Sequence, residues 1–192
     1  TTDMSVFLNT GTGSFAAAVN YPVAGGVKGI TAGDFDNDGD LDICVANSGG
    51  IIKHLVNNGA GVFGAAINVS AGSGFLGIAT SDFNGDGFND LIIGAPYAEP
   101  NGDRSGATYV VFGKTSGFPA TLDLSNLDRN SGIRLDGWGE GDFSGASVGG
   151  AVDINNDGFD DVIIGIPEKE AIYVLFGRVS GFDAALDLSS VD

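Results

Sequence analysis

The sequence predicts an all-β fold in which small sheets stack side by side as the blades of a β-propeller. Three observations predict it: strand-like apolar runs recur along the chain, they recur at long fixed periods, and no segment has a convincing helical pattern. The runs "LDICVAN", "DLIIGAP" and "DVIIGIP" are short, rich in β-branched residues and bounded by Gly, Pro or Asn, as strands are. A sheet of about four such strands cannot bury both faces alone, but stacked blades bury them against one another.

Two periods divide the chain. The stretch "VFLNTGTGSFAAAVN" from Val6 returns 48 residues later as "HLVNNGAGVFGAAIN" from His54, whereas "YVVFGKTSGFPATLDLSNLD" from Tyr109 returns after 64 residues from Tyr173. We therefore expect one segmented propeller domain over residues 1–192, with a partial blade at 1–27 and blades at 28–76, 77–130 and 131–192. A closed propeller takes roughly four to eight blades. We expect the chain to be part of a longer protein or to close by association with another copy.

The connections within each repeat also have expected forms. "NTGTGSF" and "NNGAGVF" place Asn and Gly where a hairpin needs positive φ. "TLDLSNLD" and "ALDLSSVD" fit a strand followed by a turn at least as well as a helix. The polar stretch "YAEPNGDRSGA" is absent from the second copy and predicts an inserted surface loop.

Composition excludes several partners. The formal net charge is −17, and only four of the 25 acidic residues are Glu. Asp has a short arm that binds nearby backbone, so this bias indicates that the charge is built into turns. Such an acidic chain lacks the basic patch that nucleic acid requires and would be repelled by anionic membranes. It also lacks an apolar run of 18 residues, and its single cysteine, Cys44, is expected to be a small buried hydrophobe.

Three copies of the pattern D-x-[DN]-x-D-G-x-x-D concentrate much of this acidic charge in short stretches. We call them the first, second and third Asp-rich loops, at residues 34–42, 82–90 and 153–161. Alternate side chains in a tight turn converge on one centre, and the Gly at position 6 permits the turn. All the donors are oxygen, which argues against zinc or copper and favours calcium, at about three ions per chain. An EF-hand is excluded because position 12 is Val45, Ile93 or Ile164, each inside a strand.

The predicted metal ligands are the side chains at positions 1, 3, 5 and 9 and the backbone carbonyl at position 7. They are Asp34, Asp36, Asp38, Asp40 and Asp42; Asp82, Asn84, Asp86, Phe88 and Asp90; and Asp153, Asn155, Asp157, Phe159 and Asp161. The alternative is a series of Asx-turns without metal, but such turns do not need the acidic position 9. The residues at position 8 of the second and third loops, Asn89 and Asp160, are expected to point outward.

These residues resemble a known family. "DFNGDGFNDLIIGAP" and "DINNDGFDDVIIGIP" closely resemble the FG-GAP repeat of the integrin α-chain propeller, and "FSGASVGGAVDINNDGFDDVIIGIP" from Phe143 resembles its full cassette. The 48-residue repeat is similar to the related bacterial VCBS/FG-GAP-like type. The resemblance implies a seven-bladed propeller, of which this chain would supply about three and a half repeats. It also implies calcium in the loops and a secreted or cell-surface location. The sequence departs from the family pattern at Ser144, in "FS", and at Ile166, in "GIP".

The function expected from these features is non-catalytic: adhesion to, or recognition of, an extracellular protein or glycan. One alternative is part of a carbohydrate-binding or polysaccharide-degrading propeller enzyme, and another is a structural subunit of an extracellular assembly or fibre. The only histidine, His54, is expected on an exposed strand face without a catalytic partner. Trp138 could stack on a sugar, but packing between blades is the expectation we favour.

Overall fold

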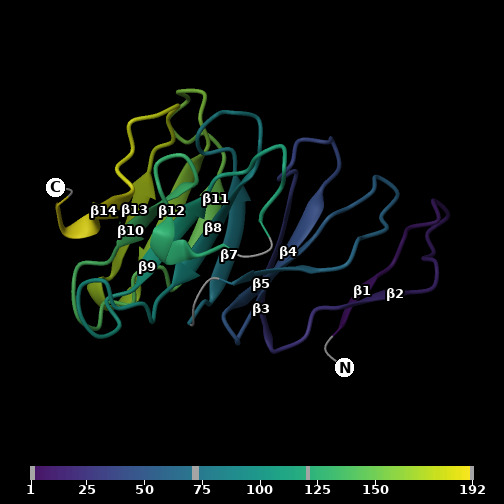
Figure 1. The fold of residues 1–192 in the computed structure, drawn as a ribbon, viewed down its shortest axis with the longest axis horizontal. Helices are drawn as coiled ribbons and strands as arrows, with labels where there is room; N and C mark the ends of the chain where they lie inside the picture. Colours follow the sequence, from purple (N-terminus) through teal and green to yellow (C-terminus); the bar gives the residue numbers. More distant parts are fainter. Residues whose placement is uncertain (1–2, 71–73, 120–121, 191–192) are drawn as a thin grey trace.

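The structure is a computed structural model of the chain. It describes residues 3–70, 74–119 and 122–190. Within these residues there are fourteen strands and three short 3-10 helices. The strands form separate sheets that follow one another along the long axis of the molecule, from the N-terminus at one end to the C-terminus at the other (Figure 1). The prediction of an all-β fold is confirmed, and the described sheets do not close into a ring.

The N-terminal hairpin and the first blade follow the 48-residue repeat. β1 (Asp3–Val6) and β2 (Val19–Pro22) form a two-stranded antiparallel sheet. The first blade is a four-stranded antiparallel meander of β3 (Val27–Gly33), β4 (Asp42–Asn47), β5 (Ile51–Leu55) and β6 (Ile67–Ser70). The two predicted hairpin connections are present, because isolated bridges pair Asn9 with Phe15 and Asn57 with Phe63.

The second blade contains one strand that the sequence division assigned elsewhere. It is formed by β7 (Gly77–Ser81), β8 (Asp90–Ala95), β9 (Ala107–Val111) and β10 (Gly132–Asp136). The repeat spacing predicts that a new blade begins at residue 131, yet β10 pairs antiparallel with β9. This outer strand therefore completes the second blade. The inserted loop of residues 97–106 lies between β8 and β9, as predicted.

The third blade has three described strands, β11 (Ser147–Ala151), β12 (Asp161–Ile166) and β13 (Ala171–Leu175). The chain then crosses back, because β14 (Ala185–Asp187) pairs parallel with β10 of the second blade. The 3-10 helix η3 (Leu188–Ser190) follows β14, so "ALDLSSVD" is a strand followed by a helical turn. The described residues of the copy "TLDLSNLD" contain the 3-10 helix η1 (Leu124–Asn126) but no strand before it, and η2 (Pro167–Lys169) precedes β13.

The core lies between the sheets. Ile92 and Val110 of the second blade pack with Val162 and Ile164 of the third, and the opposite face of the second blade packs on the first. Strand β8 is consequently buried along its whole length, which explains why its sequence is a continuous apolar run instead of an alternating one. A smaller cluster joins the N-terminal hairpin to the first blade through Tyr21 and Leu55.

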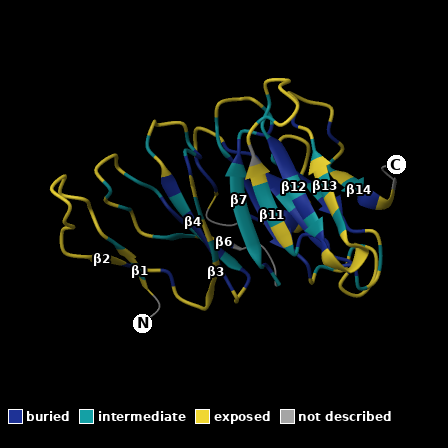
Figure 2. Ribbon diagram, turned by 180° about the vertical axis from the view of Figure 1, so that it is seen from behind, coloured by how far each residue is buried: buried dark blue, intermediate teal, exposed yellow. Residues whose placement is uncertain are grey.

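The far face of the third blade is uncovered within the described residues. Ile154, Ile172, Val174 and Phe176 are 48%, 73%, 41% and 48% exposed, and Figure 2 shows exposed residues along β13. In the second blade, the positions that correspond to Ile154, Val174 and Phe176 are occupied by side chains that the third blade buries: Phe83, Val110 and Phe112. The third blade thus presents the same apolar face that the second blade buries.

Candidate metal centre

All three Asp-rich loops join the first and second strands of a blade. The first loop lies between β3 and β4, the second between β7 and β8, and the third between β11 and β12. Consecutive blades bring consecutive loops together at one edge, because the backbone N–H of Asn89 in the second loop donates to the carbonyl of Asp34 in the first at 2.8 Å. Similarly, the N–H of Asp160 donates to the carbonyl of Asp82 at 3.3 Å.

The loops share one turn geometry. In the first loop, the carboxylate of Asp34 accepts the backbone N–H groups of Asp38 at 3.1 Å and Gly39 at 3.0 Å. The same pair of bonds recurs at Asp82 in the second loop and at Asp153 in the third. The glycine at position 6 has a φ near +90° in every copy, a left-handed conformation that Cβ disfavours. This explains why the sequence keeps Gly at that position.

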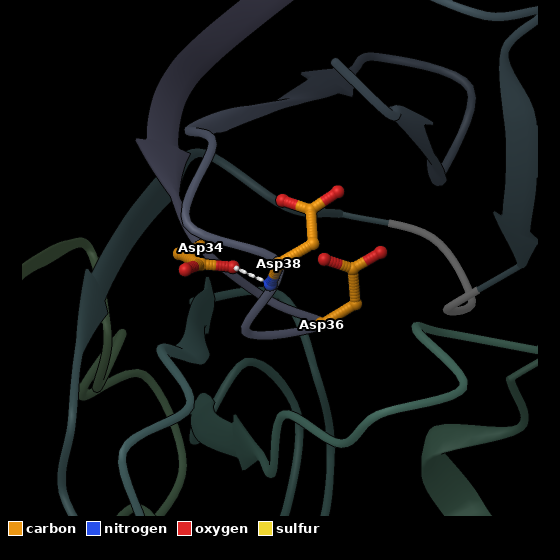
Figure 3. Close-up of side chains that lie close together, drawn as sticks. All are labelled: Asp34, Asp36 and Asp38. Atoms are coloured by element: carbon orange, nitrogen blue, oxygen red, sulfur yellow. Dashed lines mark hydrogen bonds between the residues drawn. The ribbon is translucent and has the colours of Figure 1, made fainter. Parts of the chain in front are cut away.

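The first loop brings three carboxylates together. One oxygen each from Asp34, Asp36 and Asp38 lies within 4.8 Å of the others (Figure 3). Within the described part of the chain, the Oδ1 atom of Asp36 is buried and has no hydrogen-bond partner. A buried carboxylate oxygen without a partner is costly unless a cation or a donor meets it. The donor set, all oxygen and largely carboxylate, suits a hard divalent cation, so the residues present fit calcium.

Electrostatics in the first loop point the same way. Burial raises the pKa of the Asp36 carboxyl, and repulsion from Asp42, Asp38 and Asp34 raises it further, against a backbone hydrogen bond from Asp38. Negative side chains therefore repel one another in this loop, and a divalent cation among them would remove the repulsion.

The second and third loops hold position 3 differently, because it is Asn in both. The Asn84 amide donates to the Asp86 carboxylate at 3.0 Å, and Asn155 donates to Asp157 at 2.8 Å. Each of these asparagines also accepts the backbone N–H of its position-5 partner through Oδ1. The loops therefore carry one carboxylate fewer than the first loop, and their position-5 carboxylate already has a side-chain donor.

The acidic residue at position 9 is fully buried in all three loops. Asp90 accepts the backbone N–H of Phe83 at 3.1 Å and that of Gly113 at 3.0 Å, which ties its loop to the end of β9. Asp161 makes the equivalent pair of bonds with Ile154 and Gly177. Burial raises the pKa of Asp90 to about 8; the Gly113 hydrogen bond opposes this, and the carboxylates of Asp86 and Asp82 add to it.

In the first loop a histidine takes the place of one backbone donor. Asp42 Oδ1 accepts the N–H of Asn57 at 2.8 Å, and Asp42 Oδ2 lies 2.9 Å from His54 Nε2. The expectation of an exposed His54 was wrong: it is fully buried and packs edge-on against Phe35 and Phe118. The strand that carries it is covered on one face by the N-terminal hairpin and on the other by the second blade, so the polar side chain is not on a solvent face.

Position 8 is a second feature that the sequence did not predict correctly. Asn89 Oδ1 accepts the backbone N–H of Asp34 at 2.8 Å, and Asp160 Oδ2 accepts that of Asp82 at 3.0 Å. Neither side chain points outward, because each accepts a hydrogen bond from the loop of the preceding blade. The available signal was the repeated presence of a short side-chain acceptor at position 8 of two successive copies.

The other singled-out residues are not part of these loops. Cys44 is fully buried, as expected. Trp138 is 43% exposed, but its ring also meets Tyr173 of the third blade and lies under the Lys169 ammonium, 5.7 Å from the ring centroid. It therefore packs at the boundary of two blades while keeping an open face. In the inserted loop, Asn101 donates to the carbonyl of Gly137 at 2.7 Å.

The positions of the predicted ligands are now clear, whereas their role as ligands stays a prediction. The structure gathers Asp34, Asp36 and Asp38, and it buries the position-9 carboxylate of each loop, where that carboxylate is hydrogen-bonded within the protein. The amides at position 7 bind the position-5 carboxylates in all three loops, as in the N–H of Asp40 donating to Asp38 at 2.9 Å.

Comparison with known proteins agrees with the internal repeats. The FG-GAP-like repeat family matches residues 1–45 and 34–93, and the FG-GAP repeat family matches residues 76–111 and 144–175. No curated protein matches the chain significantly. In the part of the chain that the structure describes, no helix has the length and apolarity needed to cross a membrane. The matches together cover most of the chain, and each predicted loop lies within a matched range. The chain is an FG-GAP repeat protein.

Proposed function

We propose that the chain is a calcium-stabilised β-propeller module of a secreted or cell-surface protein, with a role in adhesion or recognition. The observation that carries the proposal is the first Asp-rich loop, where carboxylates converge and one buried oxygen of Asp36 has no partner among the described residues. The recurrence of the same turn in two further FG-GAP repeats supports three such sites.

The residues that would hold calcium are the side chains at positions 1, 3, 5 and 9 and the carbonyl at position 7 of each loop. When bound, the ion supplies positive charge and links oxygens that are separated along the chain. Asp34 and its equivalents fold the turn through their backbone bonds, and the buried position-9 carboxylate fixes the turn to the third strand of its blade. The chain's own hydrogen bonds thus prepare the loop for the ion.

Calcium in this position would strengthen the joint between blades. Besides the two bonds between Asp34 and Asn89, the N–H of Lys114 in the second blade donates to the carbonyl of Phe35 at 3.1 Å. In the next joint, Arg178 makes the same bond with Phe83 at 3.1 Å. A loop that an ion holds rigid presents these groups in a fixed geometry, so the ion and the neighbouring blade stabilise each other.

A binding module is favoured over an enzyme by the state of the only histidine. His54 is buried against Asp42 and two phenylalanines, and it has no exposed surface from which to meet a substrate. The carboxylates at the open loops are engaged in turns and in the proposed ion sites. The high negative charge favours protein or glycan partners over nucleic acid or anionic membrane.

The open face of the third blade is apolar, so contact with a further blade is more favourable there than contact with water. Ile154, Val174 and Phe176 occupy the positions that the second blade buries against the third, and their apolar side chains are exposed. We propose that another FG-GAP blade covers them, which accords with a larger propeller. Light scattering over a range of concentrations tests whether a second copy supplies that blade, since the monomeric mass then gives way to a defined larger one.

Thermal unfolding with and without calcium tests the proposed function. At a hundredfold excess over its dissociation constant, a ligand adds about 2.7 kcal/mol of stability per site, which raises Tm by roughly 5–10 °C in a chain of this size. The chelator-treated protein should melt at a lower temperature, and added calcium should restore the transition. A Tm that changes neither when calcium is removed nor when it is added would refute the proposal.

A further inference from the structure

The three Asp-rich loops are not equivalent, and the difference lies at position 3. It is Asp36 in the first loop but Asn84 and Asn155 in the second and third. We infer that the first loop binds calcium most tightly, and that the joint between the second and third blades therefore loosens first as calcium falls. This inference rests on the proposed function, because it ranks sites that the proposal assigns.

The first argument is the charge of the ligands. With position 9 included, the first loop offers four carboxylates, whereas the second and third loops each offer three and a neutral amide. The number of charged ligands is one of the two properties that set calcium affinity in loops of this kind, the other being rigidity. We expect the additional carboxylate to tighten binding by about tenfold or more.

The second argument is what each loop does without the ion. In the second loop the Asn84 amide satisfies the Asp86 carboxylate at 3.0 Å, and in the third Asn155 does the same for Asp157 at 2.8 Å. The first loop has no such donor, and Asp36 keeps a buried oxygen without a partner among the described residues. An ion entering the first loop displaces no side-chain bond between positions 3 and 5, whereas in the other two loops it competes with one.

The consequence for the fold follows from which blades each loop joins. The second blade is hydrogen-bonded to the first loop through Asn89 and Lys114. The third blade is hydrogen-bonded to the second loop through Asp160 and Arg178. Because the second loop should release its ion at a higher calcium concentration than the first, the contacts of Asp160 and Arg178 should weaken while those of Asn89 and Lys114 persist.

Reciprocal substitutions test the ranking by calorimetric titration of the chelator-treated chain with calcium chloride. Asp36→Asn should remove the tightest binding step and leave three weaker ones, whereas Asn84→Asp should create a second tight step. In the absence of calcium the two variants should move Tm in opposite directions, up for Asp36→Asn, which relieves repulsion, and down for Asn84→Asp. A residue needed only for packing would not couple a higher ion-free Tm to weaker calcium binding.

The matched control is Asp103→Asn in the inserted loop, which makes the same charge change at an exposed side chain; it should leave all three binding steps unchanged. Hydrogen exchange at intermediate calcium adds a readout of the joints: the amides of Asp160 and Arg178 should exchange before those of Asn89 and Lys114. Three steps of equal affinity, or a tight step that survives Asp36→Asn, would overturn the ranking while leaving calcium binding intact. No calcium binding at all would overturn the proposed function and the ranking with it.

Discussion

The ion-free protein should lose stability as pH rises, contrary to the usual behaviour of a protein rich in aspartate. Asp90 is fully buried between the second loop and the end of β9, and its folded-state pKa is about 8 against 3.8 in an exposed chain. Because the folded state holds this proton more tightly than the unfolded state, the protonated form carries the stability. That stability is complete below pH 3.8 and disappears as pH rises through 8.

The magnitude follows from the two pKa values. Between pH 5 and pH 8 the folded state binds about one more proton than the unfolded state does. Over these three pH units the free energy of unfolding should fall by about 4 kcal/mol, at about 1.36 kcal/mol per unit. The pKa values of Asp36 and Asp82 are also raised, chiefly by burial, and so act in the same direction. Hydrogen bonds to Ser125 and Ser131 lower the pKa values of Asp123 and Asp128. The stability that these two carboxylates contribute is lost only at pH values below the range from pH 5 to pH 8.

Urea unfolding in chelator at pH 5, 6, 7 and 8 measures this dependence. The free energy of unfolding should fall across the series, and the fall should be smaller in Asp90→Asn, which cannot gain the charge. Saturating calcium should flatten or reverse the slope, because the ion stabilises the ionised carboxylates. An ion-free protein that is as stable at pH 8 as at pH 5, with Asp90→Asn parallel to it, would refute the reasoning.

Two further predictions concern the contacts between blades. Phe118 is 4% exposed and packs on Phe35 with ring centroids 5.1 Å apart, so Phe118→Ala should cost about 3–5 kcal/mol in chemical denaturation; a loss under 1 kcal/mol would mean that the second blade does not cover the first loop. At Gly150 an added Cβ would lie 1.8 Å from the carbonyl oxygen of Thr80, whereas at Gly149 its nearest neighbour is 4.0 Å away. Gly150→Ala should therefore lower Tm strongly and Gly149→Ala only slightly, and equal effects would contradict the close approach of β7 and β11.

The local features of the repeat could be predicted from the sequence because they depend on few residues. A turn that needs Gly at position 6, a hairpin that needs Asn-Gly, and an apolar run that makes a buried strand each carry their own signal. The three loops, the two hairpins and the central strands were found in this way. The chemistry of the donor set likewise followed from residue types alone.

The features that escaped prediction depend on neighbouring blades. β10 was assigned to the wrong side of a boundary because "GIRLD" pairs with β9 across a connection of about twenty residues, and repeat spacing says nothing of pairing. β14 crosses back to the preceding blade for the same reason. His54 is buried, and Asn89 hydrogen-bonds to Asp34, only because a second sheet lies against the first. The repeat spacing and the residue pattern within one repeat could not show either feature.

A direct count of bound ions tests the central claim. Calorimetric titration of the chelator-treated chain with calcium, with the mass recorded by light scattering in the same buffer, should give about three ions per chain. Three ions would establish the Asp-rich loops as the sites and account for the concentration of carboxylates in them. No binding of calcium would reduce the loops to hydrogen-bonded turns and would contradict the account of how this FG-GAP repeat protein is held together.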